Sequence, residues 1–238
     1  MSVLSCSTTV RHLLPLPDRA FETKRHRFNH LALVPAATFP TQLTQVVLAV
    51  QHLLSTGLAP HNIQLMGDSA GGNLILQLIS HILHPVADVP TLSLASPFGN
   101  ALLISPWVCL SPKVEGSVVT NSKKDLMGIP AALHFPGFVR ENTPGSGHLF
   151  LDQVNAPEGW FDDIAKVASK VLITAGDDES MRDTITVVAK RICEVHPEAT
   201  YIVQENGIHD DPAIDFVVPT PKMIGSLTPK IVDWLASG

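Results

Sequence analysis

Apolar positions along this chain fall into two patterns, short continuous runs and stripes at helical spacing. A continuous apolar run of a few residues is typical of a buried strand, whereas apolar residues recurring every three to four positions are typical of an amphipathic helix. The continuous runs predict strands at residues 63–66, 101–105, 170–176 and 200–203. Because helical stripes separate these runs, the predicted fold class is α/β, with a mostly parallel sheet and helices on both faces.

The helical stripes have recognisable ends. Pro40 precedes the first stripe and Gly57 follows it, as expected where a helix begins and ends. The apolar residues of this stripe are Leu43, Val46, Val47, Val50, Leu53 and Leu54. Residues 73–84 are apolar on nearly all sides and predict a buried helix, and later stripes predict helices at residues 185–195 and 227–235.

Two segments lack a regular pattern. Residues 1–30 mix Arg, His, Pro and Phe without a period and are predicted to be an irregular N-terminal segment, followed by the end of a strand at residues 31–34. In residues 107–161, Gly, Pro and scattered aromatic residues replace the periodicity. A long aperiodic stretch in a compact domain is usually functional or mobile. We therefore predict a single domain over residues 31–238, with a lid at about residues 107–165 that has helical pieces of its own.

Composition narrows the classes of function. The chain has 238 residues, 45% of them hydrophobic, and a formal net charge of −6, and it has no basic stripe that would indicate a nucleic-acid partner. No apolar run is long enough to span a bilayer, and no signal peptide is recognised. The chain has three cysteines, an odd number, and they lie far apart at Cys6, Cys109 and Cys193. This argues against a disulfide framework and fits a reducing compartment. A cytoplasmic location is predicted.

One motif carries specific chemistry. Residues 67–71, Gly-Asp-Ser-Ala-Gly, match the G-x-S-x-G nucleophile elbow, in which a sharp strand-to-helix turn holds a serine hydroxyl clear of the backbone. Gly67 and Gly71 supply the small residues that the turn needs, since strand and helix nearly touch there. The predicted strand before Ser69 and the predicted helix after it are the context that the motif requires. The alternative is a glycine-rich turn with an incidental serine.

A serine hydroxyl becomes a strong nucleophile only when a base takes its proton, and that base is usually a histidine held by a carboxylate. Parallel sheets bring such groups together at the carboxyl ends of their strands. Residues 176–183 follow one predicted strand and offer four carboxylates: Asp177, Asp178, Glu179 and Asp183. Residues 205–210 follow the next strand and offer His209. The order serine, acid, histidine is that of α/β-hydrolases. Asp210 and Asp211 are expected to face solvent.

Metal ligation is a weaker interpretation of the histidines. His26 and His30 are four residues apart, and His81 and His84 are three apart, as ligands on a helix can be. Neither pair has the glutamate of an H-E-x-x-H site or a third ligand nearby. No metal site and no cofactor are therefore expected.

The chain resembles the hormone-sensitive-lipase-like (type 3) branch of the α/β-hydrolase fold. Residues 67–73 have the branch's G-D-S-A-G-G-N form in full, residues 33–40 resemble its L-A-P-E-x-x-F-P segment, and residues 103–107 resemble its strand that ends in S-P-W. Residues 176–183 align with its acid loop, G-x-x-D-x-L-x-D, and this register places the acid on Glu179, where most relatives have Asp. The resemblance covers about residues 31–236.

The resemblance implies roles for single residues. Ser69, Glu179 and His209 would form the catalytic triad, the Ala70 N–H would be one oxyanion-hole donor, and Gly67, Asp68, Gly71 and Gly72 would form the elbow. The branch takes its other oxyanion donors from an H-G-G-G loop, and no His-Gly-Gly stands before Ser69. The sequence before Leu31 is also too short for that loop and the family's first strands. We therefore expect an N-terminally truncated member in which the first strands are missing.

The first hypothesis for function is a serine carboxylic-ester hydrolase that acts on a small or metabolite ester in fungal secondary metabolism. A variant of it passes the acyl group to an alcohol or amine instead of water. The second is a catalytically impaired hydrolase-like protein or fragment, as the missing loop suggests. Either way, the expected partner is a small-molecule ester, and neither a nucleic-acid partner nor a membrane-spanning segment is expected. A homodimer through residues 199–236 is predicted from the way some relatives assemble.

Overall fold

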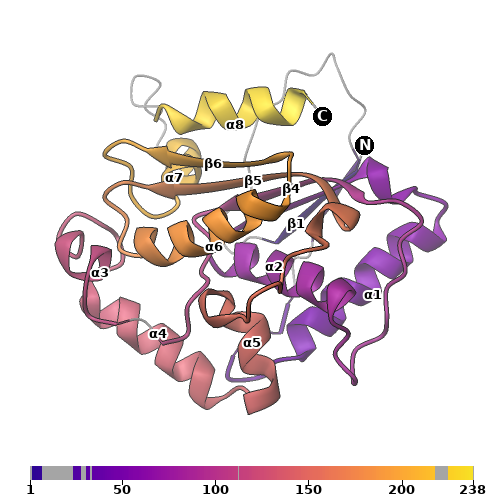
Figure 1. Cartoon of the computed structure of the whole chain (residues 1–238), viewed down its shortest axis with the longest axis horizontal. Coiled ribbons are helices and arrows are strands. Elements are labelled where there is room, and N and C mark those ends of the chain that lie inside the picture. Colours follow the sequence, from indigo (N-terminus) through magenta and orange to yellow (C-terminus); the bar gives the residue numbers. More distant parts are fainter. Residues whose placement is uncertain are drawn as a thin grey trace.

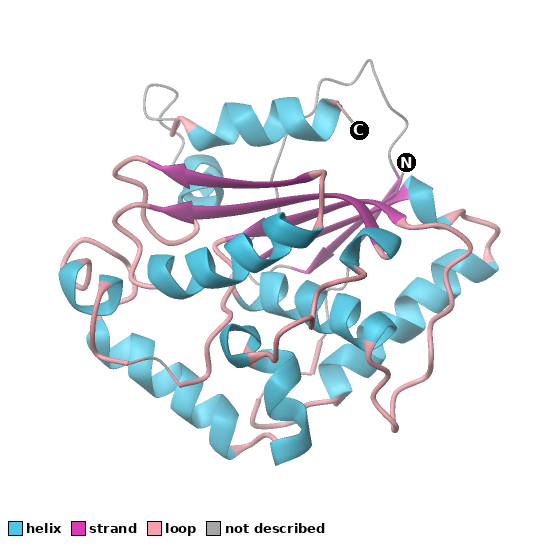
Figure 2. Cartoon of the chain, in the orientation of Figure 1, coloured by secondary structure: helices cyan, strands magenta, loops and turns pink. Residues whose placement is uncertain are grey.

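The computed structural model describes residues 2–6, 24–27, 31–32, 34–111, 113–217 and 225–237. Its six strands form one sheet in the order β2-β1-β3-β4-β5-β6, and every neighbouring pair is parallel (Figures 1 and 2). The strands are β1 Ser2–Cys6, β2 Lys24–Arg27, β3 Ile63–Asp68, β4 Phe98–Ile104, β5 Ala168–Gly176 and β6 Ala199–Gln204. Since all strands run the same way, their carboxyl ends meet at one edge of the sheet.

Helices lie on both faces of the sheet. Figure 1 shows α8 (Leu227–Ala236) against one face, and α1 (Thr41–Ser55), α2 (Ala70–Leu83) and α6 (Arg182–Val195) against the other. The short helix α7 (Asp211–Val217) follows β6. The predicted α/β-hydrolase fold, with its parallel sheet and two helical layers, is confirmed. Of the described helices, none is long and apolar enough to cross a bilayer.

The core explains why the strands appear as continuous apolar runs. Ala101 and Leu103 of β4 belong to the large cluster shared with α1, α2 and α6, whereas Leu102 and Ile104 belong to a smaller cluster with α8. All four side chains are buried. A strand covered on both faces needs apolar residues at every position rather than at alternate ones.

Most elements lie where the hydrophobic pattern predicts them, and three stretches differ. The prediction of an irregular segment over residues 1–30 is wrong for β1 and β2, which pair with each other and extend the sheet beyond β3. Both are too short to show a period, and the sequence of β2, Lys-Arg-His-Arg, has the charges that a sheet edge tolerates. Leu31, Ala32 and Val34 are not in a strand, and α7 was not predicted.

The chain between β4 and β5 is an insertion with helical pieces, as predicted. It contains α3 (Ser117–Thr120), α4 (Ile129–Glu141) and α5 (His148–Leu151), with short 3-10 turns between and after them. In α4 only Ala132 and Pro136 are buried, while Leu133 and Phe135 are 39% and 53% exposed. A helix that buries so little shows no apolar stripe, which accounts for the missing periodicity. Whether the insertion acts as a lid stays a prediction.

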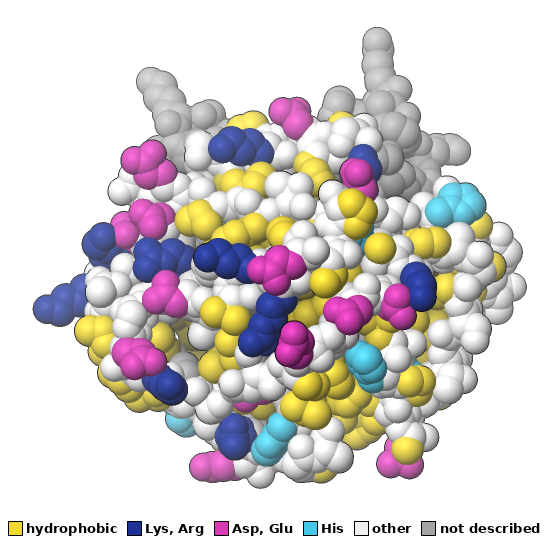
Figure 3. Space-filling view, in the orientation of Figure 1, with side chains coloured by type: hydrophobic (Ala, Val, Ile, Leu, Met, Phe, Trp, Pro, Cys, Tyr) yellow, Lys and Arg dark blue, Asp and Glu magenta, His cyan; other side chains and the backbone are white. Residues whose placement is uncertain are grey.

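Charges on the described surface are mixed. On the face shown in Figure 3, acidic and basic side chains are interspersed, and no continuous basic patch covers the described residues. This distribution agrees with the modest net charge of the sequence.

Candidate active site

Ser69 occupies the sharp turn between β3 and α2. Its φ of 48° and ψ of −116° lie outside the regions that residues with a Cβ readily adopt. A Cβ on Gly67 would overlap the Gly71 carbonyl, and one on Gly72 would lie 2.9 Å from Cβ of Pro106. The strand, the strained turn and the helix that the motif requires are therefore all present, together with the close backbone approach that glycine permits.

A continuous line of contacts joins Ser69, His209 and Glu179. The Ser69 hydroxyl lies 3.0 Å from Nε2 of His209, and Nδ1 of His209 lies 2.8 Å from Oε1 of Glu179. Glu179 is fully buried and His209 is 7% exposed. Donation from Nδ1 to the carboxylate leaves Nε2 of a neutral imidazole free to accept the hydroxyl proton. The three residues lie on three different loops, and the structure brings them together in the arrangement that the sequence predicts.

The Glu179 carboxylate is fixed on both oxygens. Its Oε2 accepts hydrogen bonds from the Gly176 N–H at 2.9 Å and from the Ser105 hydroxyl at 3.0 Å, while Oε1 faces His209. Hydrogen bonds of this kind orient the carboxylate before any substrate binds.

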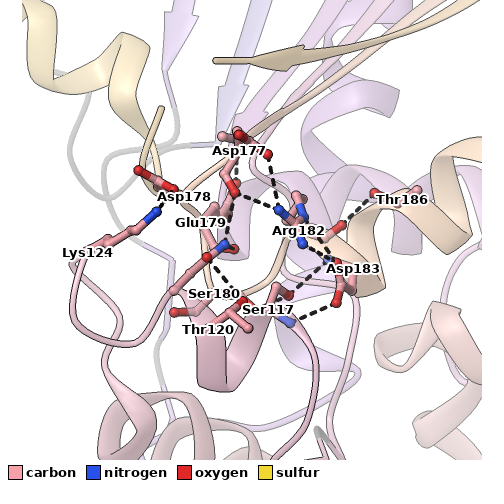
Figure 4. A network of polar contacts seen from close by, with 12 residues as sticks. Ser117, Thr120, Lys124, Asp177, Asp178, Glu179, Ser180, Arg182, Asp183 and Thr186 are labelled. Atoms are coloured by element: carbon pink, nitrogen blue, oxygen red, sulfur yellow. Dashed lines mark hydrogen bonds and ion pairs between the residues drawn. The ribbon is translucent and has the colours of Figure 1, made fainter. Parts of the chain in front are cut away.

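The other candidate acids of this loop point elsewhere, as Figure 4 shows for their side chains. Asp178 pairs with Lys124 at 2.6 Å, and Asp177 with Arg182 at 3.1 Å. Asp183 accepts the Ser117 N–H at 2.7 Å and also pairs with Arg182 at 3.0 Å. Burial acts to raise the pKa of Asp183, but these hydrogen bonds and the guanidinium charge lower it overall. Of the four acids that the sequence left open, Glu179 is the one in contact with His209.

Ser105 links the loops at the ends of β4, β5 and β6, and sequence reasoning missed this role. Its backbone φ is 42°, and its hydroxyl donates to Glu179 while accepting the Asp210 N–H at 3.2 Å. Just before it, the Ile104 carbonyl accepts the Ser69 N–H at 2.9 Å. In the sequence, Ser105 ends the apolar run at residues 101–105 and belongs to the S-P-W resemblance, but neither pattern indicates a hydrogen bond to the acid.

Asp210 corrects another expectation, because it does not face solvent. Its Oδ2 lies 3.3 Å from Nε2 of His209, and its side chain is 16% exposed. The backbone φ of Asp210 is 55°, in the left-handed region that residues with a Cβ seldom adopt. His209 therefore has a carboxylate on each nitrogen, Glu179 at Nδ1 and Asp210 at Nε2. No local pattern in the sequence indicates this contact.

These charges change how His209 binds protons. Burial acts to lower the pKa of His209, but the hydrogen bond to Glu179 and the negative charges of Asp210, Glu179 and Asp125 raise it to about 9. Burial raises the pKa of Asp210 to about 7 despite the opposing effect of His209, and the charges of Asp68, Glu179 and Asp125 add to the rise. A protonated Nε2 can donate to Asp210, whereas an unprotonated one cannot, so Asp210 favours the imidazolium.

Candidate oxyanion donors lie at the same edge of the sheet. Ala70 begins α2, and the N–H groups at a helix start have no partner within the helix. Strand β1 runs beside β3, with Cys6 opposite Gly67, so its carboxyl end lies next to the elbow. The chain that follows Cys6, residues 7–23, lies outside the described residues. Among the described residues there is no group of three or more His, Cys, Asp or Glu that could hold a metal ion.

Comparison with known proteins gives the family. A family model described as steryl acetyl hydrolase matches residues 31–220. The chain belongs to this family. It is 30% identical over 182 residues to the putative steryl acetyl hydrolase mug81 of Schizosaccharomyces pombe, an alignment that covers 72% of this chain and 45% of that protein. The chain thus spans less than half the length of this relative.

Solved esterases share the fold. An esterase/lipase from an uncultured bacterium superposes with a TM-score of 0.65 at 20% identity, covering 85% of this chain and 62% of the other. An esterase of the bacterial hormone-sensitive lipase family superposes with a TM-score of 0.64 at 20% identity, covering 84% of this chain and 61% of the other. Carboxyl esterase 2 of the fungus Tuber melanosporum superposes with a TM-score of 0.66 at 19% identity, covering 89% of this chain and 65% of the other. The resemblance to hormone-sensitive-lipase-like α/β-hydrolases is confirmed.

Proposed function

We propose that this protein is a serine hydrolase that cleaves carboxylic esters. The observation that carries the proposal is the line of contacts from Ser69 through His209 to Glu179, at 3.0 Å and 2.8 Å. The strained elbow and the burial of Glu179 support it, because both are costly features that a binding scaffold does not need. No step of this reaction calls for a metal or cofactor.

In the proposed mechanism, Nε2 of His209 takes the proton of Ser69 while Oγ attacks the ester carbonyl. Glu179 holds the imidazole in the correct tautomer and stabilises its cation. The Ala70 N–H donates to the oxyanion. His209 then passes the proton to the departing alcohol, which leaves an acyl group on Ser69. A water molecule, activated by His209 in the same way, releases the acid and restores the serine.

For the substrate we propose an acetate ester of a bulky hydroxylated metabolite such as a sterol. The family match and the name of the yeast relative support this class. A location in the cytoplasm, a part in secondary metabolism and a homodimer through β6 and α8 are further proposals, which rest on composition and on the resemblance. Light scattering of the purified protein tests the dimer.

The first experiment is labelling of the folded protein with a fluorophosphonate probe, beside Ser69→Ala with the same circular dichroism spectrum. We expect the parent to be labelled and the variant to remain unlabelled. Release of acetate from a steryl acetate, measured against a long-chain steryl ester, then tests the substrate class. A well-folded parent that resists the probe would favour the impaired-hydrolase hypothesis, which the missing H-G-G-G motif motivates.

A further inference from the structure

The loops that carry Glu179 and His209 are joined by a residue from the insertion. Asp125 lies between α3 and α4, far from both loops in the sequence. Its Oδ1 accepts the His209 N–H at 2.9 Å, and its Oδ2 accepts the Ser180 N–H at 2.7 Å. The Leu126 N–H also donates to Oδ1, at 2.8 Å. One carboxylate thus holds the backbone of His209 and of the residue directly after Glu179.

Further contacts of the same segment hold the acid loop from the same side. The side-chain amide of Asn121 donates to the carbonyls of Asp177 at 2.9 Å and Glu179 at 3.0 Å, and the Ser180 hydroxyl donates to the Met127 carbonyl at 2.7 Å. Asn121 is 4% exposed and Ser180 is fully buried. Residues 121–127 are therefore hydrogen-bonded to the acid loop after β5. Asp125 connects the same segment to the loop after β6, which carries His209.

Hydrogen bonds to an ionised carboxylate are roughly twice as strong as those between neutral groups. A carboxylate whose two oxygens accept N–H groups from two different loops also fixes the separation of those loops. Here the donors belong to the two loops whose side chains must meet at 2.8 Å. A misplacement of about 1 Å at a reacting group can cost about 100-fold in rate.

We propose that Asp125 is a positioning residue, whose carboxylate sets the separation of the Glu179 and His209 loops. The inference rests on the proposed function for its catalytic consequence. An amide at this position has one acceptor oxygen and one donor nitrogen, so Asp125→Asn cannot accept the His209 N–H and the Ser180 N–H on separate oxygens. We expect kcat to fall by about 10- to 100-fold with KM little changed, because Asp125 contacts the loops and not the ester.

A second readout separates positioning from general stability. The charged groups that face His209 are Glu179, Asp210 and Asp125, so neutralising Asp125 also moves the acid limb of the pH profile of kcat/KM to lower pH. The matched control is Asp163→Asn, the same chemical change at an exposed ion pair with Lys166. We expect Asp163→Asn to keep the parental kcat and pH profile. Asp125→Asn with the parental kcat and profile would overturn the proposal.

The proton of the His209–Glu179 hydrogen bond gives a test that does not depend on turnover. We expect a low-field proton resonance in the parent and in Asp163→Asn, and its loss or broadening in Asp125→Asn. An unchanged resonance in Asp125→Asn refutes the positioning role, and loss of the resonance supports it. Both conclusions hold even if the parent protein hydrolyses no ester. Should Asp125→Asn not fold, Asp125→Glu moves the charge by one methylene. Lower kcat at unchanged KM in that variant supports the proposal, and parental kinetics overturn it.

Discussion

Replacing Asp210 by Asn tests the electrostatics of the site most directly. The substitution keeps the shape of the side chain and removes a negative charge 3.3 Å from Nε2 of His209. His209 can act as a base only when Nε2 carries no proton, so the ascending limb of kcat/KM against pH reports its pKa in the free enzyme. With that pKa raised to about 9, we expect the limb of the parent to lie at alkaline pH.

The size of the effect follows from the geometry. Two unit charges 3.3 Å apart interact by about 1.3 kcal/mol in bulk water and by about 5 kcal/mol at an effective dielectric constant of about 20. One pKa unit corresponds to about 1.36 kcal/mol. The side chains of His209 and Asp210 are 9% and 16% exposed, so water screens part of the interaction energy of about 5 kcal/mol. A lowering of about one to three units is expected, as found for neighbouring opposite charges.

The sign is fixed by the direction of the shift. Asp210 favours the protonated imidazole, so its removal frees the base at lower pH, and the limb moves from near 9 to between about pH 6 and about pH 8. Because Asp210 itself has a pKa of about 7, its charge is present where His209 titrates in the parent. The alkaline plateau falls, since the same charge stabilises the imidazolium that forms during attack.

The assay is kcat/KM for an activated acetate ester across a pH range that brackets both pKa values, with Ser69→Ala as the blank for spontaneous hydrolysis. The matched control is Asp211→Asn, which removes a charge one residue further along. The Asp211 carboxylate contacts the Gln204 side chain and does not reach the imidazole. Profiles of Asp210→Asn and parent that superimpose would refute the argument, as would an equal shift in Asp211→Asn.

Two further predictions follow from the site and its turn. Glu179→Gln removes the charge that holds the imidazole tautomer, and kcat is expected to fall on the order of 10⁴-fold. The control Asp178→Asn breaks only the pair with Lys124, and its kcat is expected to stay within a few fold of the parent. Comparable losses of kcat in both variants would mean that Glu179 is not the acid. Gly67→Ala forces a Cβ into the Gly71 carbonyl, and we expect it to lower the free energy of unfolding in urea by at least about 1–3 kcal/mol. The control is Gly137→Ala, where a Cβ meets nothing within 4 Å. Equal stabilities of the Gly67→Ala and Gly137→Ala variants would contradict the close approach at the elbow.

The sheet was predictable because its central strands are buried on both faces. Leu102 and Leu103 pack in different clusters, so a run of apolar residues was both necessary and visible. Strand β2 is basic throughout, and its place in the sheet comes from pairing with β1, which no local pattern encodes. The aperiodic insertion was recognised, but the position of α4 could not be, because that helix buries only Ala132 and Pro136.

The residues of the candidate site also fall into two groups, those that a local sequence pattern indicates and those that no local pattern indicates. Ser69 lies in a motif with its own steric signature, and His209 follows a late strand, so both were identifiable from local sequence. The choice among four carboxylates needed the family register or the structure, because it depends on which side chain faces His209. Asp125, Ser105 and Asp210 act through contacts between loops far apart in the sequence. Such contacts leave no local pattern in the sequence.

The distribution of the site over the sheet has a consequence for folding. Ser69 follows β3, Ser105 follows β4, Glu179 follows β5 and His209 follows β6. The proposed triad can therefore assemble only when four consecutive strands have paired in register. Covalent labelling of Ser69 would then report cooperative assembly of this half of the sheet. In a denaturant titration, labelling should disappear together with the global transition, and a chain that has lost β6 should be as unreactive as an unfolded one.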